Sequence, residues 1–209
     1  MAEFDVASSA TRVGLITFSD EPEVVLPLDE YNDRYTTTQG IASTMQTYGG
    51  TKTDMALLMM NEMFQLRGRR DVPHIAIVMT DGQSDYPQLT VQEAIMVRYS
   101  GITVFAIGIG DRVDDFELTM IASAPEYVFT VNSFDALVTI REMLAISACE
   151  VELPAVRPEV EGEGEKPINE EKPEDDNHEN EVIKPTKPSL EKGNSLRYYP
   201  VTVLNNIIK

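Results

Sequence analysis

Two short polar segments carry the residue types that hold a hard metal ion. Residues 49–54 read Gly-Gly-Thr-Lys-Thr-Asp and place the hydroxyls of Thr51 and Thr53 at the start of an expected helix, where the glycines let the backbone approach closely. Asp81 and Gly82 follow directly after an apolar run. A hydroxyl and a carboxylate are hard oxygen donors, which suit Mg²⁺ better than a soft metal. The simpler alternative is that a threonine caps the helix and Asp81 caps a turn.

Alternating strand and helix patterns predict the elements that position these groups. The expected strands are residues 13–18, 23–26, 75–79, 102–109 and 127–131. The first two are close enough for an antiparallel hairpin, and the others are apolar runs typical of a buried parallel sheet. Helical spacing is found around residues 41–48, 55–63, 90–99, 114–121 and 133–144, with Thr90, Asp114 or Asp115, and Ser133 as expected caps of the last three. The pattern predicts an α/β fold with a doubly wound, mostly parallel open sheet and helices on both faces.

Ligands of such sheets bind at the carboxyl ends of the parallel strands. Asp81 lies one residue past such an end, and Thr51 and Thr53 lie at the start of a helix.

Composition and charge exclude several classes of protein. The chain has 209 residues and a formal net charge of -18, which argues against binding to nucleic acid. No apolar stretch is long enough to span a membrane, and the first residues lack the pattern of a signal peptide. Read literally, this start predicts a cytosolic protein. Cys149 is the single cysteine and cannot close a disulfide within the chain.

The chain divides into three segments by composition. Residues 1–149 mix apolar and polar positions as a globular domain does. Residues 150–195 are rich in Glu and Pro and have few large apolar residues, which predicts a disordered acidic linker or tail. Residues 196–209 are again apolar and β-prone, which is typical of an aggregation-prone or docking segment whose role the sequence leaves open.

Five blocks of the globular segment together resemble a von Willebrand factor type A domain. The blocks are residues 12–20, 49–57, 78–82, 101–110 and 117–123. They follow one another in the family's order, and the resemblance covers roughly residues 1–149. Residues 27–31 and 134–137 are most similar to extracellular-matrix members, the matrilins and non-fibrillar collagens.

The resemblance implies a non-enzymatic adhesion module with a metal-ion-dependent adhesion site. In the family, an Asp-x-Ser-x-Ser loop, a Thr and an Asp hold Mg²⁺, or Mn²⁺ or Ca²⁺, and leave one position for an acidic group of the partner. Thr51 matches the family's Thr and Asp81 its Asp. The implied partners are matrix proteins such as collagens or proteoglycans, and the choice among them would lie with the loop residues Gln83, Ser84, Asp85 and Tyr86.

The sequence departs from the family at its beginning. Residues 5–9 read Asp-Val-Ala-Ser-Ser, but Ala7 stands where the Asp-x-Ser-x-Ser loop needs a serine, and no apolar strand precedes it. The fold is therefore expected to lack its first central strand, leaving the two neighbouring strands on either side of a gap and an impaired metal site. The chain would then be a fragment of a longer secreted matrix protein. In that parent, Cys149 would pair with a cysteine outside this chain, and oligomers would form through the parent.

Two alternatives remain open. A metal-independent intracellular interaction module with the same fold agrees with the lack of a signal peptide. An enzyme is disfavoured because Gly108-Ile-Gly110 lacks the third glycine of a dinucleotide loop and is followed by repelling acidic residues. Cys149, His74 and His178 form no evident catalytic group.

Overall fold

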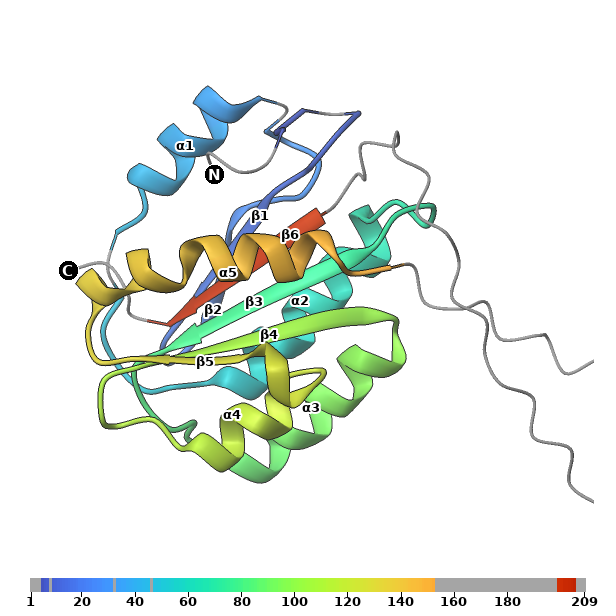
Figure 1. The fold of residues 1–209 in the computed structure, drawn as a ribbon. Helices are drawn as coiled ribbons and strands as arrows, with labels where there is room; N and C mark the ends of the chain where they lie inside the picture. The colour runs from blue at the N-terminus through green and yellow to red at the C-terminus, as the bar shows by residue number, and fades with distance from the viewer. Residues whose placement is uncertain (1–4, 8, 32, 46, 153–198, 206–209) are drawn as a thin grey trace, which may run out of the picture. The chain divides into compact units, whose positions relative to one another are not determined.

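The sheet has six strands, and its order brings together distant parts of the chain. The computed structural model describes residues 5–152, apart from 8, 32 and 46, together with the backbone of residues 199–205 (Figure 1). The strands are β1 (Gly14–Phe18), β2 (Pro22–Leu26), β3 (His74–Thr80), β4 (Ile102–Ile109), β5 (Val128–Val131) and β6 (Tyr199–Asn205). Their order across the sheet is β2-β1-β6-β3-β4-β5. Only the β1–β2 hairpin is antiparallel.

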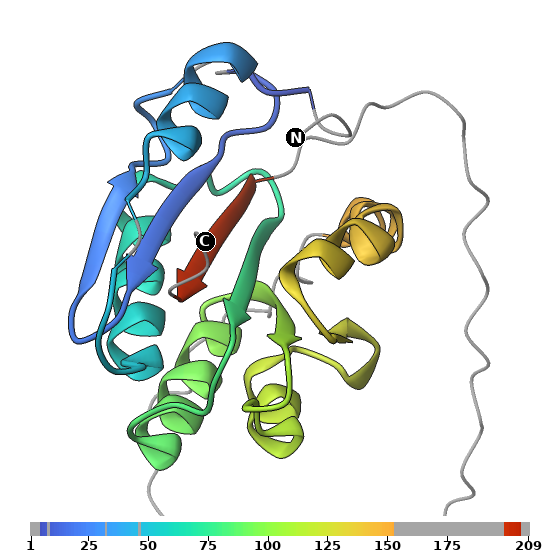
Figure 2. The ribbon, with the colours of Figure 1, turned by 90° about the vertical axis from the view of Figure 1, so that its left-hand side faces the viewer.

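The central position of the sheet is occupied by β6, which comes from the far end of the chain (Figure 2). On one side β6 pairs in parallel with β1, from Gly14 opposite Val201 to Phe18 opposite Asn205. On the other side it pairs in parallel with β3, from His74 opposite Tyr199 to Met79 opposite Leu204. This strand belongs to the same compact unit as the described residues before Glu152.

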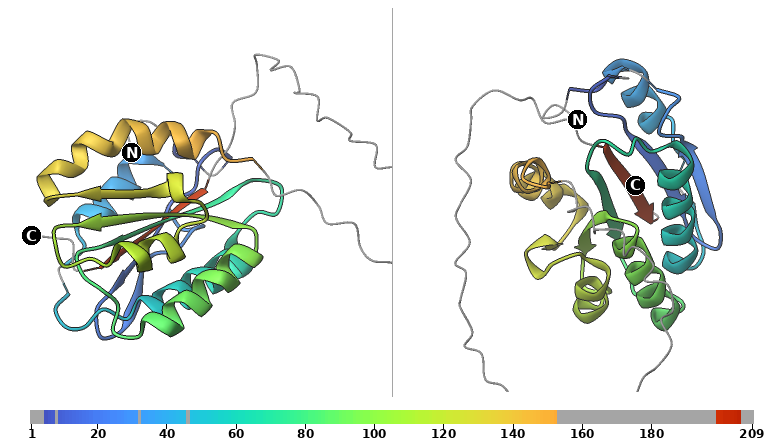
Figure 3. Two further views of the ribbon diagram at one scale, coloured as in Figure 1. Left: turned by 60° about the horizontal axis from the view of Figure 1, so that its bottom comes forward. Right: turned by 90° about the vertical axis from the view of Figure 1, so that its right-hand side faces the viewer.

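Helices cover both faces of the sheet (Figure 3). They are α1 (Arg34–Ala42), α2 (Thr53–Arg67), α3 (Pro87–Tyr99), α4 (Asp115–Ile121) and α5 (Leu137–Cys149), with short 3₁₀ turns at η1 (Pro125–Tyr127) and η2 (Phe134–Ala136). One apolar cluster joins α2, α3 and α4 to β1, β3 and β4, and a second cluster joins α5 to the opposite face of β3, β4 and β5. The two clusters bury alternate residues of the same strands: Ala76 and Val78 belong to the cluster of α2, α3 and α4, whereas Ile75 and Ile77 belong to the cluster of α5.

The doubly wound α/β fold with helices on both faces is confirmed, and so is the antiparallel hairpin. The expected gap in the sheet is not present, because β6 fills the position between β1 and β3. The expectation of disorder falls on residues 150–195, of which all but 150–152 lie outside the described residues.

The helix expected around residues 41–48 is wrong, because α1 ends at Ala42 and the next helix starts at Thr53. Two other expected helix starts are also wrong. Helix α3 begins at Pro87, with proline in the first turn, so Thr90 lies inside the helix and is buried. Ser133 precedes the turn η2 and makes no capping bond, and α5 starts only at Leu137. The expected cap at Asp114 is confirmed, because its Oδ1 accepts a hydrogen bond from Glu117 N at 2.8 Å.

Within the described residues, no helix is both long and apolar enough to cross a lipid bilayer.

Candidate functional site

Loops from several strands meet at the carboxyl edge of the sheet. Ser19 and Asp20 follow β1, Asp81 follows β3, and Gly110 follows β4. The backbone of β6 ends at the same edge, where Asn205 lies opposite Phe18. The parallel direction of these strands places all four chain segments together.

The segment around Thr51 is fixed to this edge through its backbone. Lys52 N donates to Ser19 O at 3.0 Å, and Gly50 N donates to the Asp20 carboxylate at 2.7 Å. Asp85 N in turn donates to Thr51 O at 2.9 Å. The two segments that the sequence singled out, around Thr51 and after Asp81, are thus joined directly in the structure.

The glycines of this segment are required by two carboxylates. Gly49 adopts φ 137°, a conformation that L side chains rarely take. A Cβ on Gly50 would stand 2.3 Å from Asp85 Oδ2 and 3.1 Å from Asp20 Oδ1. The Gly49-Gly50 pair therefore lets the chain pass between Asp20 and Asp85, which bring negative charge next to Thr51.

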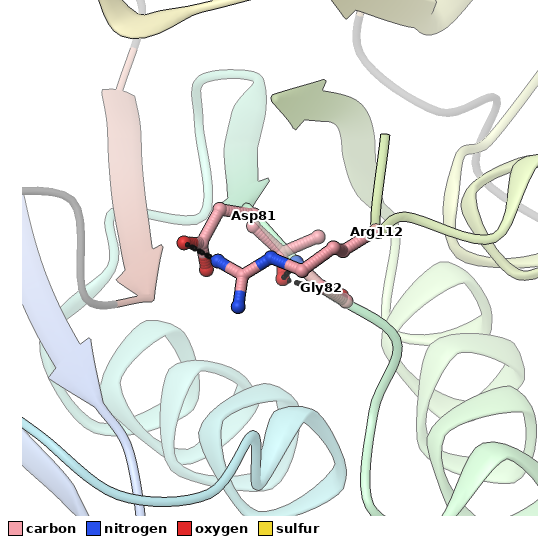
Figure 4. Close-up of polar contacts among 4 residues, drawn as sticks. Asp81, Gly82 and Arg112 are labelled. Carbon is pink, nitrogen blue, oxygen red and sulfur yellow. Dashed lines mark hydrogen bonds and ion pairs between the residues drawn. The ribbon is translucent and has the colours of Figure 1, made fainter. Parts of the chain in front are cut away.

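Asp81 forms an ion pair with Arg112, which comes from the loop after β4 (Figure 4). Arg112 Nη2 lies 2.7 Å from Asp81 Oδ2, and the Asp81 side chain is only 20% exposed. The backbone supports the contact, because Gln83 N donates to Arg112 O at 3.1 Å. The carboxylate expected to bind a metal thus already has a positively charged partner.

The four loop residues expected to face a ligand differ in accessibility. Ser84 is 6% exposed, and both its N–H and its hydroxyl donate to the buried carboxylate of Glu117. Ser84 therefore anchors the loop from inside. Gln83 is exposed and lies 3.4 Å from the Asp114 carboxylate through its side-chain amide. Tyr86 is 48% exposed and is the largest accessible side chain of the four.

Lys52 adds a second positive charge beside Tyr86. Its Nζ lies 4.1 Å from the centre of the Tyr86 ring. The interaction with Tyr86, followed by the negative charges of Asp85 and Asp54, raises the pKa of Lys52. Lys52 and Arg112 therefore give an otherwise acidic edge two cations.

Asp54, in the first turn of α2, is the one buried carboxylate of this helix. It is 8% exposed, and its Oδ1 has no hydrogen-bond partner among the described residues. The partial positive charge at the start of α2 compensates part of its desolvation.

Sequence reasoning did not single out Asp20, Arg112 or Glu117 for this edge. A signal was available for Arg112, since it follows the predicted strand 102–109 and neighbouring parallel strands end at one edge. Glu117 gave no signal, because a glutamate in the first turn of a helix is usually exposed.

The fold and the edge define a class of protein: a doubly wound α/β domain with a polar loop cluster at its carboxyl edge. The family model of the von Willebrand factor type A domain matches residues 1–143, and the chain belongs to this family.

Its relatives include matrix proteins. Over 150 residues the chain is 35% identical to the human collagen alpha-1(XXI) chain, and the match covers 70% of this chain and 15% of the collagen. It is 36% identical over 142 residues to human matrilin-4, covering 64% of this chain and 22% of the matrilin. The chain thus spans less than a quarter of either relative's length.

A solved structure of similar fold is proximal thread matrix protein 1 from the mussel byssus, with zinc in its metal-ion-dependent adhesion site (MIDAS) motif. It has 30% sequence identity to this chain and a TM-score of 0.62, and the match covers 69% of this chain and 36% of that one. The resemblance to matrix members of the family is confirmed.

This chain differs from the family's expected pattern in which part of the chain supplies the central strand. The family's Asp-x-Ser-x-Ser loop is expected to follow a first strand in the middle of the sheet. Here that position is taken by β6, whose described backbone ends at Asn205.

Proposed function

We propose that this chain is a non-enzymatic protein-binding module of an extracellular matrix or adhesion protein, and that its carboxyl edge is the binding surface. The observation that carries the proposal is the junction of the Thr51 and Asp81 segments through the Asp85–Thr51 hydrogen bond. Membership of the family and the matrix relatives support the class of partner, namely a collagen, a proteoglycan or another matrix protein. The same relatives support an extracellular location.

We further propose that the metal site is impaired. Mg²⁺ requires about six oxygen ligands in near-octahedral arrangement. The candidates Thr51 and Asp81 supply one hydroxyl and one carboxylate, and Arg112 competes for the carboxylate. Among the described residues, no three His, Cys, Asp or Glu side chains are arranged to hold a metal ion. This donor set does not fit a resident Mg²⁺, Mn²⁺ or Ca²⁺.

The Asp81–Arg112 pair also favours a second candidate, a metal-independent interaction module. A guanidinium beside Asp81 offers a partner's carboxylate a bidentate donor at the place where a metal would accept it. Such a module works without divalent ions, in the matrix or inside the cell.

The metal hypothesis is tested by isothermal titration of the full chain with Mg²⁺ and with Mn²⁺. We expect no one-to-one binding tighter than the millimolar range, because too few donors are present. Tight stoichiometric binding would refute the impaired site.

The binding hypothesis is tested with immobilised collagens and proteoglycans, with and without EDTA. Tyr86→Ala removes the largest accessible side chain of the four loop residues, and we expect it to weaken binding at least tenfold. Leu66→Ala, in the last turn of α2 and 82% exposed, is the matched control and should bind as the unaltered chain does. Equal binding by both variants would argue against the carboxyl edge as the surface.

A further inference from the structure

The central strand differs from its neighbours in how it is connected. Strands β3 and β4 are joined by α3 and a short turn at Ser100 and Gly101. By contrast, residues 153–198 lie between the last residue described after α5 and the start of β6. We define the facing edges of β1 and β3 as the acceptor slot. We propose that the acceptor slot also accepts the β6 of a second copy, so that two copies exchange β6 and form a strand-swapped dimer.

The acceptor slot requires an occupant. Because β6 lies between β1 and β3, both strands direct backbone hydrogen-bonding groups at it over residues 14–18 and 74–79. Residues of both strands, namely Ile16, Phe18 and Val78, belong to the buried apolar cluster that also contains residues of α2. An empty slot would leave two rows of unpaired backbone groups in the middle of a covered sheet, which is costly.

A second copy offers the same occupant. The pairing of β6 with β1 and β3 is between backbone groups in a defined parallel register. A strand of identical sequence can form the same ladder in the same register, as in recognition by strand addition. The closed monomer and the exchanged dimer therefore share their contacts, and the balance between them depends on the tether and on protein concentration.

The tether is long enough to allow exchange. Most connections in compact domains have about two to six residues, whereas 46 residues, 153–198, separate the last described residue after α5 from β6. Their sequence is rich in Pro and Glu. Such a tether gives β6 an effective concentration at its own slot in the millimolar range or below. In dilute solution each copy therefore inserts its own β6 and is a monomer, whereas at millimolar protein concentration the exchanged dimer is also populated.

Pro200 weakens the hold on β6. It lies opposite Ile75 in the centre of the sheet, where proline is rarely found. Because proline has no N–H, the ladder lacks one donor at the start of this strand. A central strand with a missing donor and a long tether is the natural element to leave and re-enter the slot.

Exchange is tested with cysteine reporters in the full chain carrying Cys149→Ser. One copy carries Val78→Cys and the other Val203→Cys, because Val78 and Val203 are register partners on β3 and β6. Paired neighbouring strands are close enough for a disulfide. The two copies are unfolded, mixed and refolded together at about 5 μM and at about 1 mM, which bracket the effective concentration of the tether. We expect a covalent heterodimer at the higher concentration, at least tenfold more abundant than at the lower one.

The matched control replaces Val203→Cys by Val201→Cys. Val201 lies opposite Ala76 rather than Val78, so it should not cross-link. A single chain with both Val78→Cys and Val203→Cys, refolded dilute, should close the bond internally and remain monomeric. If that bond closes but the mixed copies never give more covalent heterodimer than the off-register control, the acceptor slot accepts only the β6 of its own chain and the proposal fails. If a folded double variant does not close the bond, β6 does not occupy the slot and the proposal also fails.

The unmodified chain gives a second measurement. Light scattering after size exclusion should show a dimer once the chain has been refolded at about 1 mM, and the dimer should return to monomer after unfolding and dilute refolding. A monomer under every refolding condition would overturn strand exchange. Because no ligand is involved, this outcome is independent of the proposed binding function.

Discussion

Strands β4 and β6 both lie inside the sheet between two parallel neighbours, yet they are held in different ways. β4 is joined to α3 by a short turn and to α4 by a short loop, and seven of its eight residues are buried. β6 pairs with β1 and β3 through comparable ladders but follows the long segment 153–198. The comparison shows that two strands can have equivalent central positions and differ in how far along the chain they lie from their neighbours, and the proposed exchange would follow from this difference.

The largest effect is expected for Phe105→Ala in β4. Phe105 is fully buried, and its ring centre lies 4.3 Å from that of Tyr127. Truncation should lower the free energy of unfolding by about 3–5 kcal/mol, because it leaves a cavity. Urea unfolding should show a lower midpoint with an unchanged slope, since the same surface is still exposed on unfolding. A changed slope would mean that β4 does not unfold with the rest.

Thr202→Pro in β6 should lower the free energy of unfolding by about 1–3 kcal/mol, because proline removes a donor from the central ladder and leaves a buried acceptor unpaired. Thr202 lies opposite Leu15 on one side and Ile77 on the other. Unlike the change in β4, this one should also reduce the slope of urea unfolding, because β6 leaves the folded state and less surface remains to be exposed. Thr186→Pro, between Pro185 and Pro188, is the matched control and should change neither value. Equal midpoints and slopes of urea unfolding for the two variants would mean that Thr202 contributes no more to the folded state than Thr186 does.

A smaller, pH-dependent effect is expected at the start of β3, which pairs with both β4 and β6. Burial lowers the pKa of His74, although the hydrogen bond from its ring to Arg69 O at 2.8 Å acts in the opposite direction. The unfolded chain therefore binds the proton more readily than the folded one, so stability is complete above the ordinary histidine pKa of about 6.5 and falls as the pH drops below it.

The urea midpoint should accordingly decrease between about pH 7.5 and pH 5.5, the interval that spans the ordinary histidine pKa. His74→Gln should flatten this decrease, whereas His178→Gln, at the chain's other histidine, should leave it unchanged. An unchanged decrease in His74→Gln would assign the pH dependence to other groups.

The smallest effect is expected for Arg112→Gln. The Arg112 side chain is 74% exposed, and exposed ion pairs contribute at most about 1 kcal/mol. The midpoint of urea unfolding should shift slightly at low salt and not at all at about 1 M salt, where charges are screened within about 3 Å. A large, salt-independent loss would mean that Arg112 holds the loops together by more than charge.

Much of the sheet could be predicted from the sequence because its strands are continuous apolar runs with turns between them. The position of Asp81 at the carboxyl edge followed from the rule that parallel strands end at one edge, whereas the pairing of Thr51 with Asp81 followed from the resemblance to the family. The position of β6 could not be predicted, because periodicity identifies a strand but not its neighbours, and these lie far away in the chain. Thr90 was misassigned because Pro87 is an equally good helix start, and periodicity does not choose between the two.

The pairing of Asp81 with Arg112 lay beyond sequence reasoning for a different reason. The spacing of strands predicts that two loops share an edge, but not which side chains in them meet. Arg112 reaches Asp81 because the loop after β4 is held by the backbone bond from Gln83 N to Arg112 O.

The direction of β6 has a practical consequence for handling the protein. Since β6 runs parallel to β3, its last described residue lies at the edge where the Thr51 and Asp81 segments meet. A capture tag fused after residue 209 would be tethered only a few residues from that edge. On a sensor chip, such a tag would turn the proposed binding surface toward the support and mask it.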